Sequence, residues 1–81
     1  MITVRLPEPL RGGGNAVLNV DEPVANLAEL AEVIERHIPD YRAGDELWNF
    51  AVNGNVILHG ERQQALASGD EVEILMAFAG G

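Results

Sequence analysis

The chain has 81 residues, which is room for one domain and not for a second. It contains no cysteine, so a disulfide scaffold, a thiolate nucleophile and a cysteine-ligated zinc site are excluded. Its net charge of −8 argues against nucleic-acid binding, because phosphates attract Lys and Arg, and it favours a partner with a basic surface. No apolar run approaches the ~20 residues of a membrane-spanning helix, so we expect a cytoplasmic protein with no membrane partner.

Two short strands joined by a glycine-rich loop are expected at the N-terminus. Residues 2–6 alternate apolar and polar side chains, which is the period of a half-buried strand. Pro7 and Pro9 end this strand, and residues 16–20 form the second one. The loop between them contains Gly12-Gly13-Gly14, but it lacks the Lys-Ser/Thr pair and the following helix of a phosphate-binding P-loop. A hairpin loop is therefore favoured over a phosphate site.

The clearest predicted element is a helix before Pro39. Its apolar residues recur at the spacing of one helical face, and they are Leu27, Leu30, Ala31, Ile34 and Ile38. Asn26, with Glu29 three residues later, resembles a capping box at the N-terminus of this helix. Pro39 stops the helix at its other end.

A second hairpin follows a polar, irregular segment. We expect Leu47 and Trp48 to pack against the core, followed by strands at residues 50–52 and 55–58. Asn53-Gly54 lies between these strands, and this pair favours the type I′ turn, whose two central residues need positive φ. The segment therefore predicts a tight hairpin.

A last strand leads to the end of the sequence. Residues 61–67 are expected to form a short turn of helix, and residues 71–76 alternate apolar and acidic side chains as a strand does. The predicted order is two strands, a helix, two strands and a final strand. This order is typical of the α+β β-grasp, or ubiquitin-like, fold, a mixed sheet of about five strands packed on one main helix. The first and last strands then lie side by side at the centre of the sheet.

Three segments of the chain resemble the MoaD/ThiS family of ubiquitin-like sulfur carriers. They are Phe50-Ala51-Val52-Asn53-Gly54, Ala67-Ser68-Gly69-Asp70-Glu71-Val72 and Ala79-Gly80-Gly81. Element order and length agree with the family over the whole chain. The resemblance implies one β-grasp carrier domain over residues 1–81, with a flexible C-terminal tail at 77–81.

The resemblance also implies a chemistry for the C-terminus. A MoeB/ThiF-like activating enzyme would adenylate the carboxyl group of Gly81 with ATP, and sulfur would then replace AMP to leave a thiocarboxylate. Gly80 would let the tail thread a narrow channel, because residues without Cβ adopt backbone angles forbidden to others. A sulfur-accepting enzyme, either a MoaE-like large subunit or a cysteine-synthase-like enzyme, would consume the product. The chain itself would be a carrier that binds no cofactor, and not an enzyme.

Contacts with these partner enzymes are expected near the tail. By the same resemblance, Phe78 and Ala79 would contact the mouth of the partner's channel. Leu75 is a candidate for apolar contact with a partner, and the acids Glu71 and Glu73 are candidates for docking a basic one. The two histidines, His37 and His59, are far apart in the sequence, and no spacing of acids or histidines predicts a metal site.

The receiving pathway and two other functions stay open. Molybdopterin synthesis is the first expectation, and cysteine or another sulfur-containing metabolite is the next. Leu6-Pro7, Leu10-Arg11 and the glycine loop lean towards carriers for cysteine synthesis, while Met76 and Phe78 differ from the family's usual tail. The alternatives are a ubiquitin-like modifier and a plain β-grasp interaction module. A chain without lysine has no side-chain amine to accept an isopeptide bond, so as a modifier it could only be the donor, apart from its own N-terminal amine.

Overall fold

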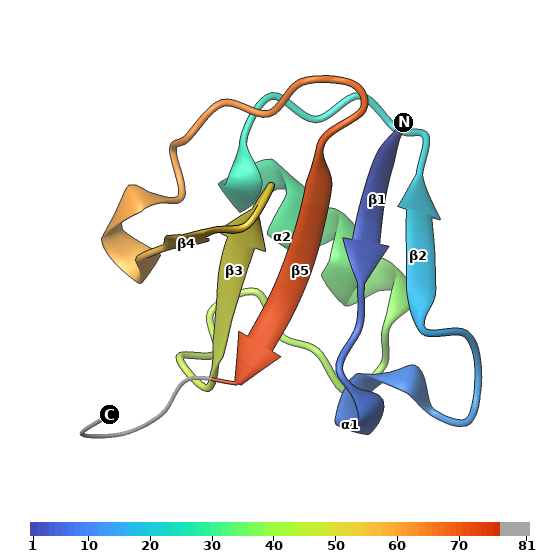
Figure 1. Ribbon diagram of the computed structural model, residues 1–81. Coiled ribbons are helices and arrows are strands. Elements are labelled where there is room, and N and C mark those ends of the chain that lie inside the picture. The colour runs from blue at the N-terminus through green and yellow to red at the C-terminus, as the bar shows by residue number, and fades with distance from the viewer. Residues whose placement is uncertain (77–81) are drawn as a thin grey trace.

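Five strands form one mixed sheet, and one long helix, α2, covers one face of it (Figure 1). The computed structural model describes residues 1–76. The strands are β1 (Ile2–Arg5), β2 (Val17–Val20), β3 (Trp48–Val52), β4 (Asn55–Ile57) and β5 (Glu71–Met76). The helices are α1 (Glu8–Arg11), α2 (Leu27–His37) and the 3-10 helix η1 (His59–Glu61).

The strand order confirms the predicted β-grasp fold. The sheet runs β2-β1-β5-β3-β4, so the last strand lies at its centre with the first strand beside it. Strands β1 and β5 are parallel, and the other three neighbouring pairs are antiparallel. The crossover between the two outer pairs of strands runs through α2, which lies behind the sheet in Figure 1.

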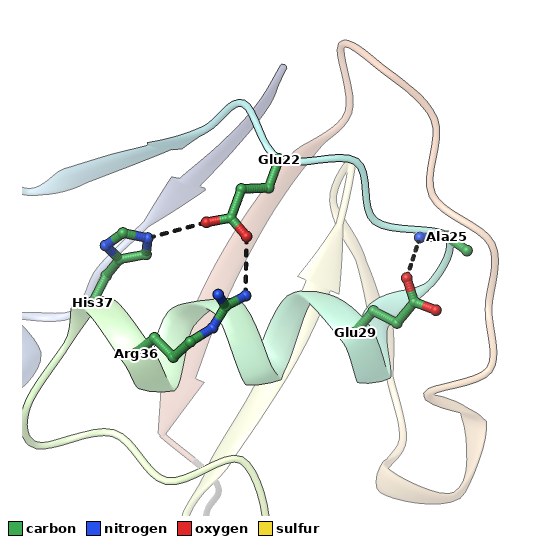
Figure 2. A network of polar contacts seen from close by, with 5 residues as sticks. All are labelled: Glu22, Ala25, Glu29, Arg36 and His37. Atoms are coloured by element: carbon green, nitrogen blue, oxygen red, sulfur yellow. Dashed lines mark hydrogen bonds and ion pairs between the residues drawn. The ribbon is translucent and has the colours of Figure 1, made fainter.

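Helix α2 forms where its apolar period predicts. All five residues of the predicted face are buried, and they pack with the inward side chains of the strands in one core cluster. At its N-terminus the Asn26 side chain accepts a hydrogen bond from the Glu29 backbone N–H at 2.9 Å. The Glu29 carboxylate in turn accepts the Ala25 backbone N–H at 2.9 Å (Figure 2). The capping interaction is therefore reciprocal, with Ala25 in place of Asn26 as the second donor.

The connection between β2 and α2 is tied to the far end of the helix. Glu22 lies on this connection and points towards Arg36 and His37 of α2 (Figure 2). Arg36 Nη2 donates to Glu22 Oε2 at 2.9 Å, and His37 Nε2 lies 3.5 Å from Glu22 Oε1. Desolvation raises the pKa of Glu22, but hydrogen bonds from His37 and Arg36 outweigh it and hold the pKa below its ordinary value. All three side chains are largely exposed, so this network adds little stability.

Three local expectations are wrong. A short helix, α1, lies within the expected N-terminal loop. The prolines do not prevent it, because they stand at its start, where a backbone N–H would have no partner within the helix. The turn of helix expected at residues 61–67 is instead η1, which ends at Glu61. Leu47 is 47% exposed, whereas its neighbour Trp48 is buried, because Trp48 begins β3 with its side chain on the core face.

Candidate functional site

Strand β5, which leads into the predicted reactive tail, is held on both sides. Val72 pairs with Val4 of β1 and with Val52 of β3, and Ile74 pairs with Phe50 of β3. All five of these side chains are buried. The strand is therefore fixed by two ladders of backbone hydrogen bonds and by the core beneath it.

A set of hydrogen bonds fastens the start of β5 to the β3–β4 turn. Asn53 Nδ2 donates to Asp70 Oδ1 at 3.1 Å, and Asn53 Oδ1 accepts the Glu71 backbone N–H at 3.0 Å. The second Asp70 oxygen accepts the Ala67 backbone N–H at 2.8 Å. This backbone hydrogen bond, followed by the bond from Asn53, lowers the pKa of Asp70 below its ordinary value of 3.8. We call the Asn53, Asp70, Ala67 and Glu71 set the β5 clip.

The β5 clip explains two of the three segments that carry the family resemblance. Asn53 has φ of 49° and Gly54 has φ of 88°, as the predicted type I′ turn requires. This backbone conformation turns the Asn53 side chain into the bonding position. The two segments therefore fasten each other at the start of β5, and their role is to position the strand.

The predicted contact residues of β5 lie on the face of the sheet opposite α2. Val72 and Ile74 point into the core, so Glu71, Glu73 and Leu75 alternate onto the other face. The two acids are exposed and Leu75 is half-buried. Glu71 Oε1 lies 3.3 Å from Arg5 Nη2, and both side chains are 60% exposed, so this ion pair leaves the acid accessible to a partner. The three residues share one surface, as contact with a single partner requires.

The remaining predicted site residues, Phe78, Ala79, Gly80 and Gly81, lie outside the described residues. Their roles stay predictions. The last described residue is Met76, which is 44% exposed.

Sequence reasoning missed one residue that stabilises the sheet near the tail, Arg62. Its guanidinium donates to the carbonyls of Ala43 at 2.6 Å and Trp48 at 3.3 Å, and it lies 4.8 Å from the centroid of the Phe50 ring. It thereby ties the segment after α2 to the start of β3. No local pattern around Arg62 indicates this, because its partners lie 14 and 19 residues away in the sequence.

Tyr41 lies in the same region and has an unusual environment. The residue is fully buried, and its hydroxyl has no hydrogen-bond partner among residues 1–76. Burial raises the pKa of the Tyr41 hydroxyl, and the Arg62 guanidinium opposes this shift. The ring packs against Phe50, with centroids 6.3 Å apart, so Tyr41 acts as a core residue.

We also looked for metal sites and membrane-spanning helices among the described residues. No group of three or more His, Cys, Asp or Glu side chains within residues 1–76 could hold a metal ion. The helices of that same part of the chain are too short and too polar to cross a membrane. The candidate site is therefore the surface around β5 from which residues 77–81 continue.

Comparisons with known proteins agree with the fold. The ThiS family model matches residues 4–81, and no curated protein matches the chain in sequence. The BexX/CysO complex of Amycolatopsis orientalis contains a similar chain, with a TM-score of 0.75 and 23% identity over 100% of both chains. CysO of Mycobacterium tuberculosis, described as an antigen, is similar with a TM-score of 0.70 and 25% identity, covering 96% of this chain and 100% of that one.

Proposed function

This chain belongs to the ThiS family of ubiquitin-like sulfur carriers, and we propose from this that it carries sulfur on the carboxyl group of Gly81. The observation that carries the proposal is the extent of the family match, which runs from residue 4 through Gly81 and so includes both terminal glycines. The central place of β5 supports it. The pairing of β5 with β3 runs to Met76, which gives the segment after it a fixed point of departure.

The proposed reaction has two steps on the carrier. In the first, a carboxylate oxygen of Gly81 attacks the α-phosphorus of ATP, and pyrophosphate leaves to give an acyl adenylate. In the second, a sulfide sulfur attacks the acyl carbon and AMP leaves, so that the carrier ends in a thiocarboxylate. Adenylation is needed because a free carboxylate is a poor electrophile. The activating enzyme supplies the ATP site, and the carrier acts as its co-substrate.

The side chains around the tail have distinct proposed roles. Gly80 lets the chain pass through a narrow channel in the partner, and Phe78 and Ala79 contact the mouth of that channel. Glu71, Glu73 and Leu75 dock the partner on the sheet face opposite α2. This surface combines two exposed carboxylates with a half-buried apolar side chain, which is the mixed character of a transient protein interface.

We favour a cysteine-synthase-like enzyme as the sulfur acceptor over a molybdopterin-synthase large subunit. The first loop, from Pro7 to Asn15, resembles both kinds of carrier in length, and Leu6-Pro7, Leu10-Arg11 and the glycines lean towards the cysteine-synthesis carriers. Helix α1 makes part of this loop an ordered segment. The likeness to Mycobacterium tuberculosis CysO supports the same choice. The molybdopterin pathway is the first expectation from the sequence. The acceptor experiment must therefore exclude sulfur transfer to a molybdopterin-synthase large subunit.

The carrier function is tested by intact mass. The chain is incubated with a ThiF-like adenylating enzyme of the same organism, ATP and sulfide, beside a chain that lacks Gly81. We expect a sulfur-for-oxygen mass gain in the full chain and none in the shortened chain. The same gain in the shortened chain would contradict the proposal. An unchanged mass of the full chain would also contradict it, provided that the same enzyme preparation is shown to be active on another carrier.

The acceptor is tested by loss of that sulfur. The thiocarboxylate form is mixed in parallel with a cysteine-synthase-like enzyme and with a MoaE-like large subunit, each with its small-molecule substrate. The thiocarboxylate sulfur attacks the acceptor's substrate, which joins the two through the acyl–sulfur bond, and hydrolysis of that bond returns the carrier to its original mass. We expect the joined product, or the original mass after hydrolysis, with the first enzyme only. Recovery of the carrier joined to lysines of other proteins would instead support a ubiquitin-like modifier. Cellular activity that survives deletion of Gly81 would support a plain interaction module.

A further inference from the structure

A groove lies beside the end of β5, at the point from which residues 77–81 continue. It has a volume of about 350 Å³ and is lined by the end of β1 with Leu6 and Pro7, by Arg11 of α1, by Ala16 and by residues 73–76 of β5. Figure 1 shows α1 and the end of β5 at the same end of the sheet. We call this depression the tail-base groove.

The sequence builds one wall of the groove by anchoring α1. Leu10 is buried, and the Leu6 backbone N–H donates to the Ala16 carbonyl at 2.8 Å, which closes the base of the loop. Arg11 Nε donates to the Leu6 carbonyl at 3.0 Å. This bond fixes the direction of the guanidinium and uses only one of its three nitrogens. Within residues 1–76, the two Nη groups of Arg11 have no hydrogen-bond partner.

The groove gathers positive charge on an acidic protein. Arg5 and Arg11 both line it, against a single carboxylate, Glu73. Carboxylates outnumber arginines in four other surface grooves of the described residues. The other four arginines are engaged: Arg5 with Glu71, Arg36 with Glu22, and Arg42 and Arg62 with backbone carbonyls. Arg11 is therefore the arginine that the tail-base groove offers to a partner's anion.

The partner that covers the groove follows from the length of the tail. The five residues after Met76 span at most about 17 Å when fully extended. An enzyme that acts on Gly81 must therefore approach the end of β5. The adenylating enzyme does so while the carrier is unmodified. A carboxylate side chain in its interface would complement Arg11, and a basic surface on the same enzyme would complement the exposed acids of the carrier.

We propose that the tail-base groove binds an Asp or Glu side chain of the adenylating enzyme, and that Arg11 is the main contact. The inference rests on the proposed function. Its consequence is that the loop carrying α1 contributes to the choice of partner, because it places Arg11.

The test measures adenylation kinetics with charge-changing variants. Pyrophosphate exchange by a ThiF-like adenylating enzyme of the same organism is followed against carrier concentration. We expect Arg11→Gln to raise the KM for the carrier about fivefold with kcat unchanged, which is the scale of an exposed ion pair. Added salt should weaken binding of the wild-type carrier more than binding of the variant.

Two matched variants separate charge from structure. Arg11→Lys loses the Nε bond to Leu6 but keeps the charge, so its KM should stay within about twofold of wild type. Arg36→Gln makes the same change of net charge away from the groove and should leave KM unchanged. Thermal melts of each variant show whether α1 and the sheet remain folded. Finally, an Asp or Glu→Arg change in the enzyme interface should restore binding of an Arg11→Glu carrier.

Each contrary outcome has a distinct meaning. An unchanged KM for Arg11→Gln, an equal loss in Arg36→Gln, or an equal loss in Arg11→Lys would each overturn the groove proposal. A change in the KM for ATP alone would assign the groove to a nucleotide phosphate, and a defect confined to sulfur release would assign it to the accepting enzyme; both also overturn it. If the wild-type chain supports no exchange, the proposed function itself fails.

Discussion

The two ends of strand β5 are built differently. At its start, the β5 clip joins a hairpin turn to the strand through side-chain and backbone hydrogen bonds. At its end, Leu75 is half-buried, Met76 is exposed, and a groove with two arginines lies beside them. Hydrogen bonds therefore fasten the start of the strand, and the end of the strand presents accessible surface to a partner. The start of the strand is paired with both β1 and β3, whereas residues 74–76 are paired with β3 alone and border the tail-base groove.

The largest expected effect comes from removing the core beneath both ends. Phe50 is 1% exposed, pairs with Ile74 and lies under the Arg62 guanidinium. Phe50→Ala should lower the free energy of unfolding by about 3–5 kcal/mol, through lost burial and the cavity left behind. Urea denaturation measures this. Leu58→Ala, at a side chain that is 63% exposed, is the control and should change stability by about 0.5 kcal/mol or less. A loss below about 1 kcal/mol for Phe50→Ala would contradict the packing described.

A smaller effect is expected from opening the β5 clip. Asn53→Ala removes two hydrogen bonds and places at φ of 49° a residue that adopts the left-handed conformation less readily than asparagine does. The expected loss is about 1–3 kcal/mol, and amide exchange should rise first at Glu71. Asn19→Ala, at an exposed asparagine of β2, is the matched control. Met76→Ala, at the other end of β5, should cost about 0.5 kcal/mol or less; equal losses at the two ends would remove the contrast between them.

The smallest expected effect is on the dependence of stability on pH. The Ala67 backbone N–H and the Asn53 amide lower the pKa of Asp70 in the folded chain. The Asp70 carboxylate therefore adds to the free energy of unfolding at pH values above its unfolded pKa, near 3.8. This contribution is lost as the pH falls through the lower pKa of the folded chain. Asp70→Asn should flatten the fall in stability in this acidic window, measured by urea denaturation across pH. Asp21→Asn, at an exposed aspartate, should not. A carboxyl titration of Asp70 at or above 3.8 would show that the clip does not favour the charged form.

The sequence predicts those helices and strands that depend on neighbouring residues, such as a helix cap, a turn pair or an apolar period. The apolar period and Asn26 identify α2, Asn53-Gly54 identifies the hairpin, and the alternation of residues 71–76 identifies β5 and its outward face. Helix α1 could not be predicted in this way, because it is short and is stabilised by the burial of Leu10 in the core. Leu47 next to Trp48 shows the same limit, since the sequence does not reveal which of two adjacent apolar residues starts the strand.

The site divides in the same way. The face of β5 that carries Glu71, Glu73 and Leu75 follows from alternation alone. The role of Arg62 and the tail-base groove depend on contacts between distant parts of the chain, so no pattern in the sequence indicates them. The reactive role of Gly81 comes from the family resemblance and stays a prediction, because it concerns chemistry with a partner.

The most direct test of the central claim is to locate the sulfur atom. The carrier is treated with the adenylating enzyme, ATP and sulfide, digested, and the C-terminal peptide is fragmented by mass spectrometry. Sulfur should replace one oxygen of the Gly81 carboxyl group, and every other fragment should keep its original mass. Sulfur on any other residue, or a native chain that continues past Gly81 and is never trimmed, would contradict this claim.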